Sequence, residues 1–294
     1  MKNILLSTLL SSLLLSNALY AKSEIKSVNA VSKAAVAKGT QDALANQKKL
    51  ISEAIDSLTF THKALVALNN NKSADAQKNI EKALGKLEVI LTAKNAPKLL
   101  PIDSKVNMVE YVGDKHSIEN SLITVSDLLK HHKVQEARLL LNTLQSEIDL
   151  TVVSLPLITY PDALKLAAKY LHENKVEKAK SVLELALSTF DTTTTVIPLP
   201  LLKATDLINV SASLSKSGKK EEALKYLKAA EDQLDVAQAL GYVSKSSTTY
   251  KALHSAIKDV RKEIKGKNRA EKLFEKLKKS LEDFKSKIFS QKSA

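Results

Sequence analysis

The sequence predicts a mainly all-α protein of stacked antiparallel helical hairpins, with a few short extended segments or a minor β-sheet. Alanine, leucine, lysine and glutamate dominate the 294 residues, whereas glycine and proline occur only six times each. This composition favours helix and leaves little material for tight β-turns. Apolar residues also recur at heptad-like steps, as they do along the buried face of an amphipathic helix. A repeated turn pattern then indicates that the helices pair as hairpins.

The first 21 residues have the layout of a secretory signal peptide. Lys2 supplies a positive charge, an apolar stretch follows, and small residues then allow cleavage after Ala18 or after Ala21. The apolar stretch is shorter than the roughly 20 residues that span a membrane. We therefore expect residues 1–21 to be a signal peptide and the protein to be periplasmic. A buried N-terminal helix or an uncleaved anchor is the alternative.

Two helices are expected immediately after the leader. Apolar spacing predicts a short helix over Glu24–Lys38 that ends near Gly39, because glycine commonly terminates helices. A long helix is expected over Asp42–Asn69, where leucines and isoleucines fall on one face. These helices open a helical domain that we place at residues 22–265.

A turn pattern then repeats four times. In each copy a lysine is followed four residues later by an alanine, and an amphipathic helix follows; the pairs are Lys72/Ala76, Lys133/Ala137, Lys175/Ala179 and Lys219/Ala223. Two copies match over a longer span, since TVVSLPL at Thr151–Leu157 recurs as TVIPLPL at Thr195–Leu201. Helix–turn–helix units of this size gain their stability by stacking on one another.

Three segments break the helical period. They are rich in β-branched residues or carry proline, and they read KVNMVEYVG (Lys105–Gly113), TVVSLPL and TTTTVIPLPL. Such segments are extended connectors or short strands of a small sheet. Pro161 fits the first turn of a helix, where its missing N–H costs nothing, and Asp162 in that turn favours the positive end of the helix dipole.

The C-terminal segment 266–294 is predicted to be a basic amphipathic helix. From Ile264 to Ala294 the chain holds ten Lys/Arg and four Asp/Glu, out of a net charge of +13. The helix either packs its apolar stripe on its own protein or an oligomer partner, or attaches to an anionic membrane surface.

Five motifs in a fixed order resemble the YfdX family. They are LPID (Leu100–Asp103), YVGD (Tyr111–Asp114), SLPLITYPDALKLAA (Ser154–Ala168), VIPLPL (Val196–Leu201) and LGY (Leu240–Tyr242). The resemblance covers roughly residues 35–260. It implies a helical periplasmic protein that forms homo-oligomers such as tetramers and takes part in acid and multidrug stress. It further implies no established enzymatic activity, with small molecules or unfolded client proteins as the suggested partners.

The sequence offers no catalytic or metal-binding constellation. It lacks G-x-S-x-G, H-E-x-x-H and a phosphate-binding glycine loop. It also has no cysteine, which excludes disulfides, thiol catalysis and thiolate metal sites. Aromatic residues make up only 4% of the chain, which argues against nucleic-acid binding by base stacking. We therefore expect no enzyme, no cofactor, no metal and no nucleic acid.

Two tyrosines and one aspartate are candidate ligand-binding residues: Tyr160, Asp162 and Tyr111. Tyr160 and Asp162 flank Pro161 in the longest family-like motif. They either shape a strand-to-helix turn, or Tyr160 lines a ligand crevice together with Tyr111.

His62 is a candidate pH sensor. It falls within the apolar stripe of its predicted helix. It is either a histidine with its hydrogen bonds made, in the core or at its edge, or a protonation switch. A histidine buried in its neutral form resists charging as the pH falls through about 6.5. The adjacent His131 and His132 lie at a turn and are expected to be exposed.

We thus expect a non-enzymatic, stress-associated periplasmic protein that binds small molecules or client proteins. The alternative is a structural or surface-associated protein that docks to an anionic membrane through its basic C-terminal helix.

Overall fold

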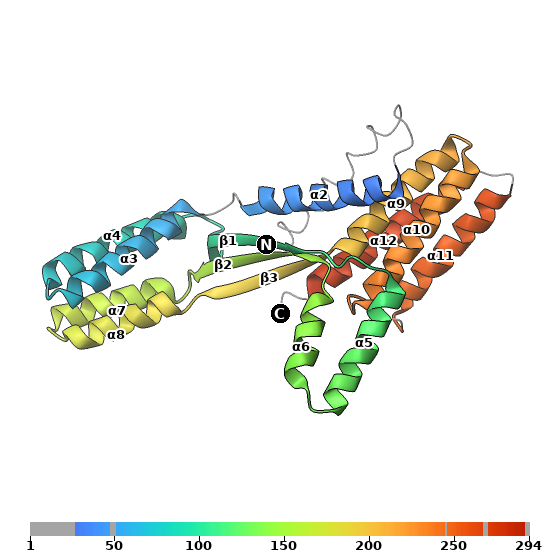
Figure 1. The fold of residues 1–294 in the computed structure, drawn as a ribbon. Coiled ribbons are helices and arrows are strands. Elements are labelled where there is room, and N and C mark those ends of the chain that lie inside the picture. Colours follow the sequence, from blue (N-terminus) through green and yellow to red (C-terminus); the bar gives the residue numbers. More distant parts are fainter. Residues whose placement is uncertain (1–26, 48–50, 245, 267–269, 292–294) are drawn as a thin grey trace. The chain divides into compact units, whose positions relative to one another are not determined.

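The computed structural model describes residues 27–47, 51–244, 246–266 and 270–291 (Figure 1). These residues form eleven helices and one small antiparallel sheet with strand order β1-β2-β3. The mainly all-α fold class predicted from the sequence is therefore confirmed. Within the described ranges, no helix is both long enough and apolar enough to cross a membrane. The expected signal peptide lies outside the described residues.

Helical hairpins alternate with strands along the chain. The elements are α2 (Val28–Gln47), α3 (Ser52–Asn69), α4 (Ser73–Leu91), β1 (Leu99–Val109), α5 (Lys115–Lys130), α6 (Val134–Thr143), β2 (Glu147–Pro156), α7 (Tyr160–His172), α8 (Val176–Ser188), β3 (Asp191–Pro198), α9 (Leu199–Lys216), α10 (Lys220–Ala239), α11 (Thr248–Lys265) and α12 (Glu271–Gln291).

The chain divides into two compact units, and the division falls within each of the three strands. Unit 1 comprises Asn46–Lys105 and Thr151–Thr194, and unit 2 comprises Val106–Leu150 together with the described residues before Asn46 and after Thr194. Hairpins α3–α4 and α7–α8 thus belong to unit 1, whereas α5–α6 and α9–α10 belong to unit 2. Successive hairpins alternate between the units. These limits differ from the sequence-based boundaries at 22–265 and 266–294.

The four repeated turns share one geometry. The residue before each turn lysine has a positive φ: 58° at Asn71, 59° at His132, 55° at Asn174 and 77° at Gly218. Each lysine N–H donates to the carbonyl five residues earlier at 2.8–2.9 Å, which closes a Schellman motif on the first helix. The lysine is then the N-cap of the second helix rather than the end of the first.

The repeated alanines explain why each hairpin closes tightly. All four are buried, at Ala76, Ala137, Ala179 and Ala223. A methyl side chain at this position lets the two helix backbones approach closely just after the turn. The sequence repeat is therefore a structural repeat of one helical hairpin.

Unit 1 is a four-helix arrangement. Helix α3 packs against α4 and α8, and α4 packs against α7 (Figure 1). Its core contains leucine, isoleucine and many alanines, including Leu68, Ile80, Leu164 and Leu183. Each hairpin in this unit therefore covers the apolar face of the other.

In unit 2, helices α9 and α10 form the centre. Helix α12 packs against α9, and α11 packs against α10 and α12. The apolar stripe of α12, including Phe274, Leu277 and Leu281, is buried in this core. This packing agrees with the first of the two alternatives for the basic C-terminal segment, in which its apolar stripe packs on its own protein.

The prediction that the first helix ends near Gly39 is wrong. Helix α2 continues through Gly39 to Gln47. A Cβ at Gly39 would overlap Leu202 Cδ1 and approach Ile148 Cδ1 to 3.3 Å. The glycine therefore permits close packing within unit 2 rather than ending a helix.

The expected single helix over Asp42–Asn69 is also wrong. Helix α2 ends at Gln47, α3 begins at Ser52, and Ile51 has extended dihedral angles. The Ile51 N–H donates to the Pro101 carbonyl at 3.0 Å. This bond to strand β1 replaces the intrahelical bond that a continuous helix would need.

The three segments that break the helical period overlap the three strands of the sheet. Strand β1 begins earlier, at Leu99, and the end of the third segment lies in α9, which begins at Leu199. The Thr151 and Thr194 hydroxyls lie 3.1 Å apart between β2 and β3. The Leu157 N–H donates to the Lys98 carbonyl at 2.9 Å, beside the β1–β2 pair. Pro161 and Asp162 lie in the first turn of α7, as predicted.

Candidate functional site

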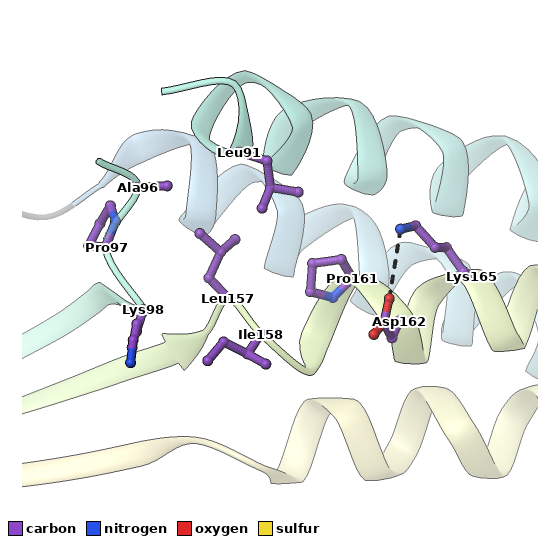
Figure 2. Close-up of a pocket in the computed structure, with 9 residues that line it drawn as sticks. All are labelled: Leu91, Ala96, Pro97, Lys98, Leu157, Ile158, Pro161, Asp162 and Lys165. Atoms are coloured by element: carbon purple, nitrogen blue, oxygen red, sulfur yellow. Dashed lines mark ion pairs between the residues drawn. The ribbon is translucent and has the colours of Figure 1, made fainter. Parts of the chain in front are cut away.

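Unit 1 contains a pocket of about 330 Å³ beside the N-terminus of α7. Figure 2 shows that its lining comes from the end of α4, the segment leading into β1, the segment between β2 and α7, and α7 itself. Six of the lining residues are apolar: Leu91, Ala96, Pro97, Leu157, Ile158 and Pro161. The pocket therefore offers mainly hydrophobic contact.

Three charged residues complete this pocket. Lys98 and Lys165 contribute ammonium groups, and Asp162 contributes a carboxylate. The Lys165 Nζ and Asp162 Oδ1 atoms lie 3.7 Å apart on an exposed surface (Figure 2), where such a pair contributes little stability. The lining therefore carries one positive charge in excess. Asp162, a sequence candidate, lies at the pocket, whereas Lys98 was missed because no local pattern marks it.

Tyr160 lies in the core of unit 1 rather than in the lining of this pocket. Its side chain is buried with the α3 and α4 apolar residues. Burial raises the pKa of Tyr160 to about 12, and the neighbouring Thr61 side chain opposes part of that rise. In this position the ring fixes the start of α7 and so places Asp162.

Tyr111 belongs to unit 2, where the YVGD motif caps α5. The Ser117 backbone N–H donates to Asp114 Oδ1 at 2.9 Å, and this bond holds the pKa of the Asp114 carboxyl below its ordinary value. The Tyr111 hydroxyl donates to Ser117 Oγ at 3.2 Å. A Cβ at Gly113 would lie 2.5 Å from the Tyr111 ring, so this motif has a clear structural role.

His62 is exposed on α3. The described residues therefore do not bury this side chain, as the protonation-switch hypothesis would require. His131 and His132 are both exposed at the α5–α6 turn, and His132 occupies the positive-φ position.

A polar cluster between α10 and α11 was not anticipated from the sequence. The Tyr250 hydroxyl donates to Asp235 Oδ1 at 2.8 Å, and His254 Nε2 lies 3.3 Å from the same oxygen. Arg261 pairs with Glu231. Burial is the main cause that raises the pKa of Tyr250. The i,i+4 spacing of Glu231 with Asp235 and of Tyr250 with His254 could have indicated that these side chains share a helix face. The cluster links α10 to α11.

Metal coordination has no candidate in the part of the chain that the structure describes. No three histidine, aspartate or glutamate side chains in these ranges gather in a way that could hold an ion. We therefore consider the pocket at α7 as the candidate binding site.

Comparison with known proteins supplies the family. The model of the YfdX protein family matches residues 57–196, a shorter span than the roughly 35–260 expected from the motifs. A solved structure of Salmonella Typhi YfdX is similar at 14% sequence identity, over 51% of this chain and 93% of that chain, with a TM-score of 0.36. No curated protein matches the chain. Residues 57–196 therefore match the YfdX family, as the motifs suggested.

Proposed function

We propose that this protein is a non-enzymatic, stress-associated protein of the periplasm that binds small amphiphilic molecules in the pocket at α7. The observation that carries the proposal is the pocket itself. Its volume of about 330 Å³ falls within the range of about 300–1,000 Å³ that is usual for small-molecule sites. The apolar lining suits the hydrophobic part of a ligand.

The charged residues favour an anionic group on that ligand. Lys98 and Lys165 outnumber Asp162 in the lining, and the N-terminus of α7 adds the positive end of a helix dipole. No carboxylate among the described residues forms an ion pair with Lys98. A small molecule with an aliphatic body and one carboxylate therefore matches the lining best.

A thermal-shift titration with decanoate tests this proposal. We expect saturable stabilisation by decanoate and a weaker effect of decylamine at equal concentration, because ligand that binds the folded state raises its stability. Ile158→Asp places a carboxylate in the apolar lining and should abolish the decanoate effect. Lys98→Gln should weaken decanoate binding by roughly two- to fivefold, as expected for one exposed charge.

Leu185→Asp is the matched control. Leu185 and Ile158 are both 65% exposed, and both lie in unit 1, but Leu185 does not line the pocket. The control should retain the decanoate effect. Equal loss in both variants, or equal stabilisation by decanoate and decylamine, would refute the assignment. Suppressed aggregation of unfolded proteins without any decanoate effect would favour client binding instead.

A second candidate function is docking to an anionic membrane surface through α11 and α12. Seven lysines of these helices are exposed: Lys251, Lys258, Lys262, Lys265, Lys272, Lys276 and Lys279. Their apolar stripe is buried in unit 2, so docking would be electrostatic and should be reversed by salt.

Cosedimentation with phosphatidylglycerol vesicles tests this second function. The triple variant Lys272→Gln, Lys276→Gln, Lys279→Gln should lose most of the binding at low salt. Substitution is preferable to deletion of residues 267–294, because deletion would remove part of the unit 2 core. Binding that survives the triple variant would exclude α12 as the docking element.

A further inference from the structure

The core of unit 1 contains three hydroxyl groups among its leucines and alanines. Ser57 and Thr61 lie on α3 and are fully buried, and Tyr160, the first residue of α7, is 2% exposed. Thr61 is close enough to Tyr160 to affect the pKa of its hydroxyl, so the ring extends from α7 toward α3. Such a cluster needs a structural explanation, because burying a polar group without a hydrogen bond is costly.

Two of these three positions are equivalent in the hairpin repeat. When the hairpins are registered on their turn lysines, Ser57 and Tyr160 each stand fifteen residues before the lysine. The other two hairpins place Ile118 and Ala204 there, and both are fully buried. Unit 1 therefore has a hydroxyl in both of its hairpins at the position where unit 2 has apolar side chains.

The packing of unit 1 directs these equivalent positions toward a shared centre. Helix α3 packs on α4 and α8, and α7 packs on the same two helices. Helices α3 and α7 therefore lie at opposite corners of the four-helix arrangement. Ser57 and Tyr160 thus face its centre from opposite sides, a small side chain against a large one.

Two of the three hydroxyls form no hydrogen bond with the described residues. These are Ser57 Oγ and the Tyr160 hydroxyl. Thr61 Oγ1 donates to the Ser57 backbone carbonyl at 2.9 Å, which leaves its lone pairs free to accept. Burial raises the pKa of Tyr160 to about 12, so this hydroxyl keeps its proton and can donate. The cluster therefore offers donors and acceptors to one small polar molecule.

We propose that one buried water molecule links Tyr160 on α7 to Ser57 and Thr61 on α3. A buried water makes about three hydrogen bonds to polar groups that otherwise lack partners, and the three hydroxyls supply that number. The three side chains carry no charge at neutral pH, so the cluster suits water better than an ion. The water joins two helices that lie at opposite corners of unit 1.

This bridge makes Tyr160 a positioning residue for the pocket at α7. Tyr160 directly precedes Pro161 and Asp162, which line that pocket (Figure 2). Holding the ring against α3 fixes the first turn of α7, and that turn carries both lining residues. The positioning role rests on the proposed binding function, whereas the water itself does not.

A high-resolution crystal structure of the wild-type protein tests the water directly. One water should lie about 2.5–3.0 Å from both Ser57 Oγ and the Tyr160 hydroxyl, the usual range for O–H···O hydrogen bonds. A direct hydrogen bond between these two side chains would overturn the proposal. So would a Ser57 hydroxyl that donates to a carbonyl of its own helix, with no water beside Tyr160.

Thermal unfolding of three variants tests the same bridge in solution. Ser57→Ala and Tyr160→Phe each remove one partner of the water and should each lower Tm, because the remaining hydroxyl stays buried without its partner. The double variant should recover part of this loss, since replacing both polar partners by apolar groups is nearly neutral. Losses that simply add in the double variant would show that the two hydroxyls do not share a water.

Tyr170→Phe is the matched control on the same helix. Tyr170 is a partly buried tyrosine of the unit 1 core, ten residues after Tyr160. Because it lies away from the cluster, any change in Tm from Tyr170→Phe should add to the change from Ser57→Ala. Non-additivity as large as that of the Tyr160→Phe pair would contradict the bridge.

The decanoate titration tests the positioning role. Tyr160→Phe should weaken decanoate binding by roughly two- to fivefold, as expected for the loss of one hydrogen bond, whereas Tyr170→Phe should leave it unchanged. Wild-type affinity in Tyr160→Phe would refute the positioning role. A wild-type protein that does not bind decanoate would refute the pocket assignment and the positioning role together, while the crystal structure still decides the water.

Discussion

Hairpins α7–α8 and α5–α6 have the same turn and different surroundings. Both place an αL residue before the turn lysine and bury the alanine four residues later. Yet Leu183 on α8 is fully buried, and its equivalent Leu141 on α6 is 43% exposed. The turn thus specifies a hairpin locally, whereas the stability of its apolar face depends on a covering layer that the turn does not specify.

The largest expected effect comes from truncating the leucine in each hairpin. Leu183→Ala should lower the free energy of unfolding by about 2–5 kcal/mol, because it leaves a cavity in a packed core. Leu141→Ala should lower it by less than about 1 kcal/mol in dilute protein, where the face is solvated. Urea unfolding followed by circular dichroism measures both. Equal losses at low concentration would show that α5–α6 is already covered within one chain.

A buried lysine on α12 gives a second test of how a covering helix contributes to stability, because α12 packs on α9 in unit 2. Lys285 is buried, and desolvation by burial lowers its pKa, partly offset by Glu282 and Asp206. Between the lowered pKa and the unfolded value of about 10.4, the unfolded chain binds more protons, so stability rises with pH. The slope should reach up to about 1.4 kcal/mol per pH unit.

Lys285→Met should remove this alkaline rise in stability. Methionine has no proton to release, and its apolar chain suits the buried position. Thermal unfolding between pH 8 and pH 10.5 gives the comparison. A rise that persists in the Lys285→Met variant would assign it to another group.

The smallest expected effects come from the turns themselves. Gly218→Ala should lower stability by about 1 kcal/mol, because φ at this residue is 77° and a Cβ is strained there. His132→Gly should raise stability by roughly 0.5 kcal/mol, since it relieves the same strain at a cost in backbone entropy. If glycine at the positive-φ position stabilised one of the hairpins α9–α10 and α5–α6 and destabilised the other, the turn conformation would not be determined locally.

The sequence predicts the hairpins well because their determinants are local. Turn lysines, alanines and β-branched segments located four hairpins and three strands, and Pro161 marked the start of α7. The end of α2 at Gln47, the separate start of α3 at Ser52 and the passage of α2 through Gly39 were missed. Both depend on long-range partners, the Pro101 carbonyl and the Leu202 side chain, which no local pattern contains.

The candidate site was predictable only in part for the same reason. Asp162 was marked by its place in a helix start, and it does line the pocket. Lys98 and Leu91 join it only through the fold of unit 1. The inward direction of the Tyr160 ring follows from packing against α3 and α4, so the sequence left both of its roles open.

Hydrogen–deuterium exchange tests the central comparison most directly, because α6 and α8 are measured in the same sample. Amides of α6 should exchange faster than amides of α8, since Leu141 on α6 is exposed and Leu183 on α8 is buried. If α6 and α8 exchange at the same rate, the two hairpins do not differ in cover and the comparison is contradicted.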